Sequence, residues 1–261
     1  MDSRRVFLGV TAIVIAASAA MTIATCVSMS AMGEMAMPGG WTMSHMWMRI
    51  PGQSWLGATA SFVAMWLVMM VAMMLPSLVP TLLCYRDTAG ATGAARPGSL
   101  SALVAVGYFA VWAAVGAMVF PLGTMFANVM MRESEASRVV PVVVGVTVVV
   151  AGVIQHSRWK ARHLAVCRGT PGAHLTKPVG MAAAWRHGVH IGFACTRSCA
   201  GLTAVALAFG MMDLRVMAIV GAAITFERRA RNGERVGRVI GVIVTTVGFA
   251  LLASAADLAR G

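Results

Sequence analysis

The chain has 261 residues, of which 59% are hydrophobic and only 11% are charged. This composition is far from that of a soluble domain and is typical of a polytopic membrane protein. The formal net charge of +12 is not a sign of nucleic-acid binding, because the basic residues lie beside long apolar runs, as they do in the loops of membrane proteins. The five cysteines are an odd number, which excludes a framework built only of paired disulfides.

Seven apolar stretches predict an all-α fold, a polytopic transmembrane helix bundle. The first stretch is long enough to span a bilayer, and we interpret it as an uncleaved helix rather than a signal peptide. A lone β-strand would leave its backbone unsatisfied in lipid, so even the β-branched fourth stretch is expected to be helical. The stretches are residues 6–24, 55–85, 100–127, 139–154, 190–211, 214–226 and 236–256. If the short 214–226 segment is re-entrant, six spans remain.

Lys and Arg are distributed unequally between the two sides of this predicted bundle. Fifteen lie in segments on the side of the N-terminus, and five lie on the opposite side. Because cytoplasmic loops carry the excess of basic residues, we expect a multi-pass protein of the bacterial inner (cytoplasmic) membrane with a cytoplasmic N-terminus. Seven spans then place the C-terminus outside, whereas six spans would return it to the cytoplasm.

We expect one integral membrane domain, residues 1–261, with two long polar segments. Residues 27–54 form an outer loop rich in Met and His, and residues 155–186 form a basic cytoplasmic loop. The cytoplasm keeps thiols reduced, so imidazole and thiol side chains of the second loop could also bind metal. They are His156, His163, Cys167 and His174. The first three would share one helix face if the fourth helix continued past Ile154.

The outer loop offers closely spaced thioether side chains and one imidazole. The candidate metal ligands are Met43, His45, Met46 and Met48. A thioether is uncharged and soft enough to prefer Cu(I) over Zn(II) or Mg(II), and it avoids the disulfide formation that would disable thiols in an oxidising compartment. Met can also be apolar filler near a membrane. Filler is a weaker explanation in a loop than in a helix, so the sequence favours copper capture here.

Two imidazoles and two thiols open the fifth apolar stretch. They are His187, His190, Cys195 and Cys199. Positions three or four apart share a helix face, so each pair could chelate copper or zinc. The two pairs point about 120° apart on a helix, so we expect a site shared with another helix, or one on an unwound segment near Gly188 and Gly192. The alternative is that both cysteines are small packing residues.

Arg197 is the only charged residue well inside a predicted span rather than near its end, and an ionisable group at membrane depth is costly unless it is paired or hydrated. Glu227 ends the next span and lies nearly as far from the turn at Asp213 as Arg197 does, which places the two at similar depth. We therefore expect an Arg197–Glu227 pair, or another polar partner for each. An arginine beside Cys195 and Cys199 would favour their metal-binding thiolate forms.

Signatures of enzyme chemistry are missing from the sequence. It contains no CxxC, HExxH, GxSxG or P-loop motif. None of its nine acidic residues lies inside a predicted apolar stretch. We therefore expect no enzymatic activity.

Three ordered blocks carry a family resemblance. The first is Trp66 with the run Met69-Met70-Val71-Ala72-Met73-Met74-Leu75-Pro76-Ser77. The second is Gly152-Val153-Ile154-Gln155, followed by Lys160 and Cys167-Arg168. The third runs from Gly192 to Cys199 and continues with Gly210-Met211-Met212-Asp213, Met217 and Glu227-Arg228.

Over residues 41–229 these blocks resemble a bacterial family of predicted metal-binding integral membrane proteins, a domain-of-unknown-function family in which some members are labelled copper chaperones. The resemblance implies a membrane-embedded fold and metal binding. The family pattern C-x-G-C-C reads Cys195-Thr196-Arg197-Ser198-Cys199 in this chain. Ser198 thus replaces one thiol and Arg197 replaces the glycine, which leaves fewer thiols for chelation.

The sequence therefore predicts a copper-handling membrane protein that captures Cu(I) at the outer loop. It would pass the ion to a copper-acceptor protein or across the membrane, with the lipid bilayer as its surroundings and no nucleic acid as a partner. Two alternatives remain. One is an accessory or structural subunit of a larger membrane complex with no metal role, and the other is a small-solute transporter.

Overall fold

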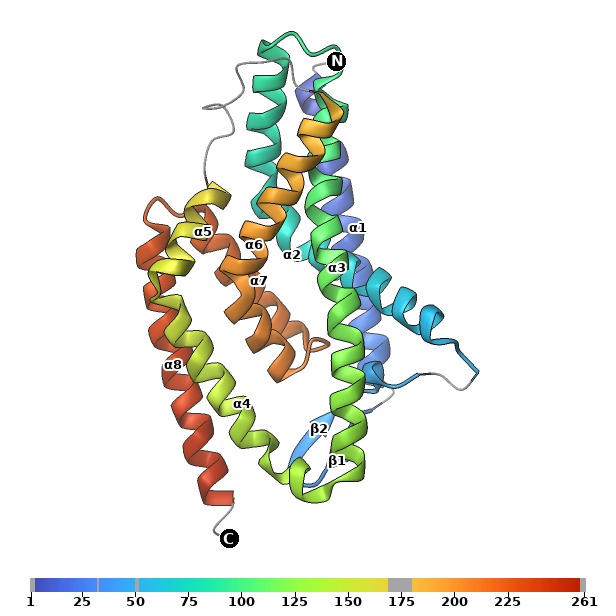
Figure 1. Ribbon diagram of the computed structural model, residues 1–261, viewed down its shortest axis with the longest axis vertical. Helices are drawn as coiled ribbons and strands as arrows, with labels where there is room; N and C mark the ends of the chain where they lie inside the picture. Colours follow the sequence, from blue (N-terminus) through green and yellow to red (C-terminus); the bar gives the residue numbers. More distant parts are fainter. Residues whose placement is uncertain (1–2, 32, 50–51, 169–179, 259–261) are drawn as a thin grey trace.

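Helices dominate the part of the chain that this computed structural model describes, which is residues 3–31, 33–49, 52–168 and 180–258 (Figure 1). His174, one of the candidate ligands, lies outside these residues. The helices are α1 (Ser3–Ala31), α2 (Trp55–Ala91), α3 (Pro97–Arg132), α4 (Ser134–Gln155), α5 (Arg158–Arg168), α6 (Met181–Phe209), α7 (Leu214–Arg229) and α8 (Gly233–Leu258). Between α1 and α2 lie the strands β1 (Met35–Met37) and β2 (Trp41–Met43) and the short 3-10 helix η1 (His45–Trp47).

Six of the described helices are long and apolar enough to cross a membrane: α1, α2, α3, α4, α6 and α8. This confirms the all-α bundle, in its six-span form. α7 has 16 residues, which at 1.5 Å per residue is about 24 Å and shorter than the ~30 Å apolar core of a bilayer.

The direction of α7 nevertheless affects the topology. α7 runs from the end of α6 to the start of α8, and the two termini lie at opposite ends of the molecule (Figure 1). A helix packed inside a bundle does not have to match the thickness of the lipid. Because α7 also runs through the bundle, the two termini lie at opposite ends (Figure 1), as the seven-span prediction expects and the six-span alternative does not.

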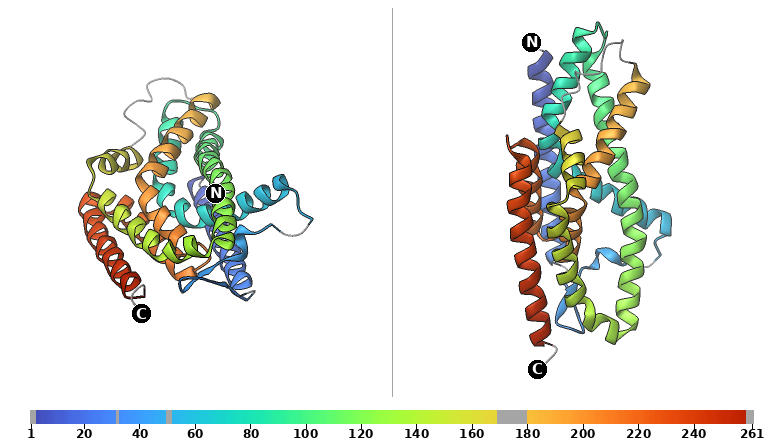
Figure 2. Two further views of the ribbon diagram at one scale, coloured as in Figure 1. Left: turned by 60° about the horizontal axis from the view of Figure 1, so that its bottom comes forward. Right: turned by 60° about the vertical axis from the view of Figure 1, so that its left-hand side comes forward.

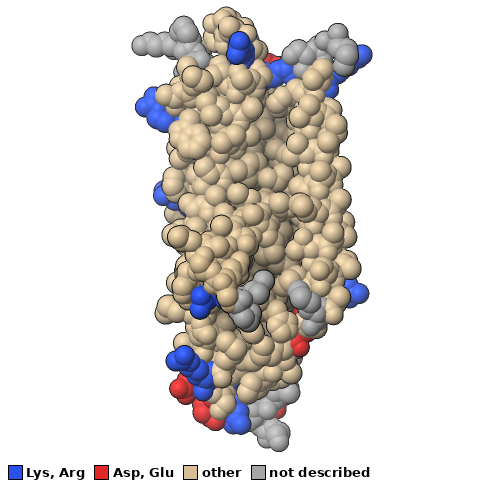
Figure 3. Space-filling model, turned by 90° about the vertical axis from the view of Figure 1, so that its right-hand side faces the viewer, with Lys and Arg blue, Asp and Glu red and all other residues tan. Residues whose placement is uncertain are grey.

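The middle of the molecular surface is apolar. Figure 3 shows one face with charged side chains gathered towards the two ends and few between them. Large hydrophobic side chains are exposed on several of the long helices, for example Ile13, Leu56, Leu122 and Phe249. Exposed apolar surface of this extent is typical of contact with a membrane, so the six apolar helices are compatible with lipid contact.

Glycines allow α3 and α6 to approach each other closely. A Cβ atom at Gly188 would lie 2.1 Å from the carbonyl oxygen of Val104, and one at Gly107 would lie 2.7 Å from that of Trp185. Small residues at such positions let helix backbones come together in membrane bundles. α6 is continuous from Met181 to Phe209, so the alternative of an unwound segment near Gly188 and Gly192 is wrong, and these two glycines serve helix packing instead.

The helix pair α4 and α8 forms one edge of the bundle, where the two lie side by side (Figure 2). Its contact also depends on glycine, since a Cβ atom at Gly152 would lie 2.6 Å from the backbone nitrogen of Thr245. α4 ends at Gln155, and a turn separates it from α5. The condition under which His156, His163 and Cys167 would share one face, a fourth helix that continues past Ile154, is therefore not met.

α2 contains Pro76 and Pro80 and ends at neither of them. A proline removes one N–H donor and clashes with the preceding turn, which bends a helix, and α2 changes direction along its length (Figure 1). α2 packs against α1, α3 and α7. The large buried side chains Trp66, Tyr85, Tyr108 and Trp112 on α2 and α3 form much of the core.

The Met-rich segment folds as a hairpin against the junction of α3 and α4. β1 and β2 pair with Met35 opposite Met43 and Met37 opposite Trp41. The alternation of a strand puts these four side chains on one face, where they pack against Met130 and Val140. The indole N–H of Trp41 donates to the carbonyl of Ser137 at 2.9 Å. Residues 27–54 are therefore only partly a loop, because α1 reaches Ala31 and the hairpin follows.

A buried thiol centre as the candidate metal site

Four helices bring three thiols, a phenol and a guanidinium together inside the bundle. We call this group the thiol centre: Tyr108 of α3, Cys167 of α5, Cys195 and Cys199 of α6, and Arg228 of α7. All five side chains are buried, and none belongs to a residue more than 6% exposed. The close packing of α3 on α6 at Gly188 and Gly192 sets Tyr108 against Cys195.

The Sγ atom of Cys195 lies in the middle of the thiol centre. It is 3.8 Å from Sγ of Cys199. The phenol of Tyr108 donates to it at 2.9 Å, and Nη1 of Arg228 donates to it at 3.5 Å. Donors that converge on one sulfur stabilise negative charge there, so the geometry favours Cys195 as a thiolate ligand.

Cys167 supplies a third sulfur from the end of α5. Its Sγ atom lies 3.9 Å from the hydroxyl of Ser198, which itself lies 3.8 Å from Sγ of Cys199. A hydrogen bond with Cys195, together with burial, raises the pKa of Cys167. Both effects favour the thiol form of Cys167 over its thiolate.

Arg228 is a buried cation, and the groups that balance its positive charge are unusual. Its Nη1 donates to the hydroxyls of Ser77 at 2.9 Å and Tyr108 at 3.4 Å, while its Nη2 has no hydrogen-bond partner among the residues that the structure describes. A buried guanidinium is costly unless negative charge lies close to it. Its neighbour in sequence, Glu227, is engaged elsewhere, so Cys195 is the ionisable group best placed to carry that charge.

Glu227 belongs to a second buried network beside the thiol centre. Its carboxylate accepts from Nζ of Lys160 at 2.6 Å and from the amide of Gln155 at 3.1 Å. Lys160 also donates to the side-chain oxygen of Gln155. The side chains of Lys160 and Glu227 are each 3% exposed, so this network joins α4, α5 and α7 in the interior.

The predicted Arg197–Glu227 pair is wrong. Arg197 is exposed, and its guanidinium lies 5.9 Å from the centre of the Phe193 ring. Two residues along a helix correspond to a rotation of about 200°, so Arg197 points away from the side on which Cys195 faces the interior. Equal distance from a turn sets the depth of two residues but not the direction in which they point. Arg228 takes the place beside the thiols that was expected for Arg197.

The two histidines of α6 lie apart from the thiols. His187 stacks on the ring of Tyr85 with 5.2 Å between the ring centres, and His190 is exposed. His187 precedes Cys195 by eight residues, which is about 12 Å along a helix. The structure thus brings together Cys195 and Cys199 from the predicted set of four, but not the histidines with them.

The four predicted ligands of the outer segment also divide between different surroundings. Met43 is buried with Met35 and Met37 in the cluster under the hairpin. Met46 packs into the main core instead. His45 and Met48 are half-buried at η1. Their role in metal binding stays a prediction.

Sulfur is the donor that this site offers to a metal. Among the described residues, no three His, Cys, Asp or Glu side chains are arranged to hold a metal ion. The Cys195–Cys199 pair cannot by itself complete the four-ligand shell of Zn(II). Thiolates select Cu(I), which accepts a lower number of ligands, so the pair fits Cu(I) better than Zn(II).

Reasoning from sequence missed Tyr108, Ser77 and Arg228 as parts of this site. Arg228 was the most detectable of them, because it follows Glu227 at the end of a short apolar stretch that belongs to the family resemblance. Nothing in the sequence around Tyr108 indicates its partner, since Cys195 lies 87 positions further along the chain.

Comparison with curated proteins and with solved structures gives no match. A family model does match residues 63–251, and it is PpoB2, described as copper chaperone. The matched residues make up well over half of the chain and include every member of the thiol centre, whereas the hairpin lies outside them. The chain therefore belongs to the PpoB2 copper chaperone family.

Proposed function

We propose that this chain binds Cu(I) within the bilayer of the bacterial inner membrane and hands it to a copper-acceptor protein or across the membrane, without catalysing a reaction. The copper chaperone family and the six apolar helices support the general role. In this proposal the N-terminus is cytoplasmic and the hairpin faces outside. The thiol centre holds the ion during transfer.

The observation that carries the proposal is the Cys195–Cys199 pair with its converging donors. With metal–sulfur bonds of roughly 2.3 Å, two sulfurs 3.8 Å apart subtend about 110° at a shared ion. That angle leaves one side of the ion open. Cys167, which contacts Ser198 between the two ligands, is placed to approach that side.

Charge balance also supports Cu(I) at this position. One Cu(I) ion and the thiolates of Cys195 and Cys199 carry a net charge of −1, and the guanidinium of Arg228 neutralises it. Because Cys195 is already a thiolate beside Arg228, one proton, that of the Cys199 thiol, leaves when the ion binds. A neutral assembly is what a buried site requires, because an uncompensated charge in the interior is costly. A divalent ion with the same three groups would leave one positive charge.

Capture at the outer segment is the second part of the proposal. The hairpin face and α3 bring the thioethers of Met35, Met37, Met43 and Met130 into one cluster, and Met46, Met48 and His45 follow directly. Uncharged soft ligands suit Cu(I) in an oxidising compartment. Because the hairpin lies outside residues 63–251, capture would be an addition of this chain to the part shared with its family.

A Cu(I) competition assay on the full-length protein in nanodiscs tests the thiol centre. Replacing both ligands, Cys195→Ser with Cys199→Ser, should remove one tightly bound, sulfur-coordinated Cu(I) ion. Cys84→Ser is the matched control, because Cys84 is a half-buried thiol of α2 outside the centre, and it should leave binding unchanged. Equal Cu(I) binding by the double variant and the native chain would overturn the proposal for this site.

A further inference from the structure

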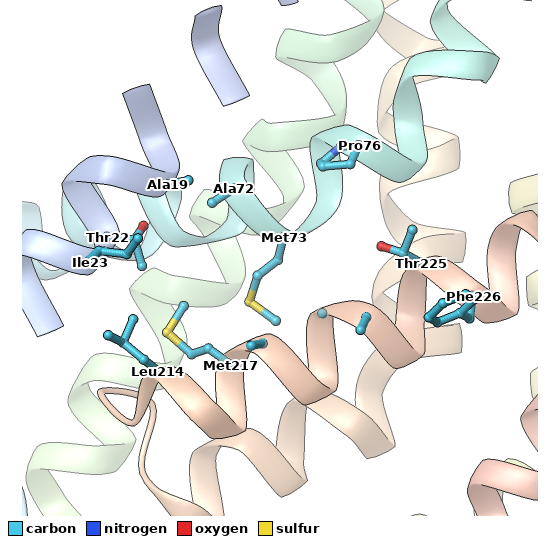
Figure 4. Close-up of a pocket in the computed structure, with 13 residues that line it drawn as sticks. Ala19, Thr22, Ile23, Ala72, Met73, Pro76, Leu214, Met217, Thr225 and Phe226 are labelled. Carbon is cyan, nitrogen blue, oxygen red and sulfur yellow. The ribbon is translucent and has the colours of Figure 1, made fainter. Parts of the chain in front are cut away.

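A second group of sulfur atoms lies between α1, α2 and α7, at a pocket of about 430 Å³ (Figure 4). Met73 of α2 and Met217 of α7 extend from facing helices into the same space (Figure 4). Sγ of Cys26, on α1, lies 4.0 Å from Sδ of Met217. Cys26 is 1% exposed, so its thiol is shielded from solvent and directed at the thioether.

This sulfur group is separate from the thiol centre. Met217 lies near the start of α7 and Arg228 near its end, and eleven residues of helix correspond to about 16 Å. The two sites are nevertheless linked by α2, because Ser77, which accepts from Arg228, follows Met73 by one helical turn. The sulfur group thus lies near the start of α7, and the thiol centre lies near the end of the same helix.

An unpartnered hydroxyl faces the same pocket. Thr22 lines it and is 5% exposed, and its Oγ1 has no hydrogen-bond partner among the residues that the structure describes. Thr11 and Thr25 of the same helix instead donate to the carbonyl four residues before them, each at 2.8 Å. A buried hydroxyl without a partner is costly. Thr22 precedes Cys26 by one turn, so a ligand held by the sulfurs would lie within reach of this oxygen.

We propose that Cys26, Met217 and Met73 form a second Cu(I) site at this pocket. Two sulfurs 4.0 Å apart subtend about 120° at an ion with metal–sulfur bonds of roughly 2.3 Å, which is the angle of a trigonal site with one further ligand. Met73 lies across the pocket from Met217 to supply that ligand (Figure 4). The inference rests on the copper-handling role proposed above.

The charge of the ligand set identifies the ion. The thiolate of Cys26 and Cu(I) together are neutral, and the two thioethers add no charge, so the filled site suits its apolar walls. One proton, from the Cys26 thiol, leaves for each ion bound. Zn(II) or Cu(II) would leave a positive charge beside the apolar side chains that line the pocket. Thioether ligands also select Cu(I) over these ions.

Two multiple-cysteine variants isolate this site. The first keeps Cys26 and carries Cys84→Ser, Cys167→Ser, Cys195→Ser and Cys199→Ser, and the second adds Cys26→Ser. In nanodiscs without oxygen, with a chromogenic chelator as competitor, the first variant should bind one Cu(I) ion at least ~10-fold more tightly than the second. In the Cys26-containing background, Met217→Leu or Met73→Leu should weaken binding by roughly 10-fold or more. Met65→Leu, two turns before Met73 on the same helix, should not.

A single substitution checks the inference in an otherwise native chain, in case the multiple variants do not fold. Cys26→Ser alone should lower the copper content by one ion per chain and leave the ion at Cys195 and Cys199 in place. Equal binding with and without Cys26, or equal effects of Met65→Leu and Met217→Leu, would overturn the second site. Failure of the thiol centre appears separately, as unchanged binding when only Cys195 and Cys199 are replaced.

Discussion

At the scale of single residues, the proposed copper binding depends on which arginine side chain lies beside the sulfur atoms of the thiol centre. Arg228 donates to Cys195 and Tyr108 and has a free Nη2 among the described residues, so its positive charge acts mainly on the thiol centre. Arg197, only two residues from Cys195, has no such contact because it points outwards. Proximity in the sequence therefore does not predict which arginine stabilises the thiolate form of the cysteines.

Removing the charge of Arg228 should weaken Cu(I) binding. Arg228→Gln leaves the copper–dithiolate with an uncompensated negative charge in the interior, and we expect a loss of affinity of roughly 10- to 100-fold. Arg228→Lys keeps the charge and should recover part of that loss. Chelator competition on the purified protein measures both. Arg229→Gln is the control, because this neighbour is exposed; an equal effect of both Gln variants would contradict the assigned role of Arg228.

At the scale of elements, buried polar contacts determine how the helices are arranged around the site. Lys160, Glu227 and Gln155 join α5, α7 and α4, and glycines seat α6 on α3. Glu227 holds the end of α7 in position, and it directly precedes Arg228, the residue that contacts the thiols. The network thus positions Arg228 without contacting a sulfur itself.

Breaking this network should cost far more than breaking an exposed ion pair. Glu227→Ala leaves Lys160 charged and unpaired in the interior, and we expect a loss of roughly 3–5 kcal/mol of stability. The exposed Glu135–Arg138 pair, at 3.3 Å, is the comparison, and Glu135→Ala should change stability by about 1 kcal/mol or less. Unfolding in mild detergent measures both, and the double change Lys160→Met with Glu227→Leu should restore much of the loss. Similar effects of the two alanine variants would show that the buried pair is not a structural link.

At the scale of the whole molecule, the short helix α7 determines the topology. It is too short to be counted among the six long apolar helices, yet it carries the chain back through the bundle and separates the two termini (Figure 1). The hairpin lies towards the end of the molecule opposite the N-terminus (Figure 1). The capture proposed for the hairpin would therefore take place at the end of the molecule opposite the N-terminus (Figure 1).

Reporter fusions test this topology. Alkaline phosphatase, which is active only outside the cytoplasm, should be active when fused after Gly261. Green fluorescent protein, which fluoresces only inside, should be fluorescent when fused after Asp87, near the end of α2. A fluorescent fusion at Gly261 together with one at Asp87 would place both on the same side and contradict the crossing by α7.

Local chemistry in the sequence was enough to predict the fold class and the proximity of Cys195 and Cys199. Apolar length specifies a membrane helix because the bilayer has a set thickness, and the softness of thioether donors favours Cu(I) whatever the fold. The spacing of Cys195 and Cys199, one helical turn, brings their sulfurs together once α6 forms. These properties depend on residues close to one another in the chain.

Only the tertiary structure decided what surrounds those sulfurs. The rotation of each helix about its own axis depends on how the helix packs. This rotation places Arg228, rather than Arg197, beside the thiols. It also pairs Glu227 with Lys160 and stacks His187 on Tyr85. The contacts of Tyr108 with Cys195 and of Cys26 with Met217 join positions 87 and 191 residues apart. No local pattern predicts such contacts, because helices with the same apolar faces can pack in many rotations, and the glycines and buried charges select among them.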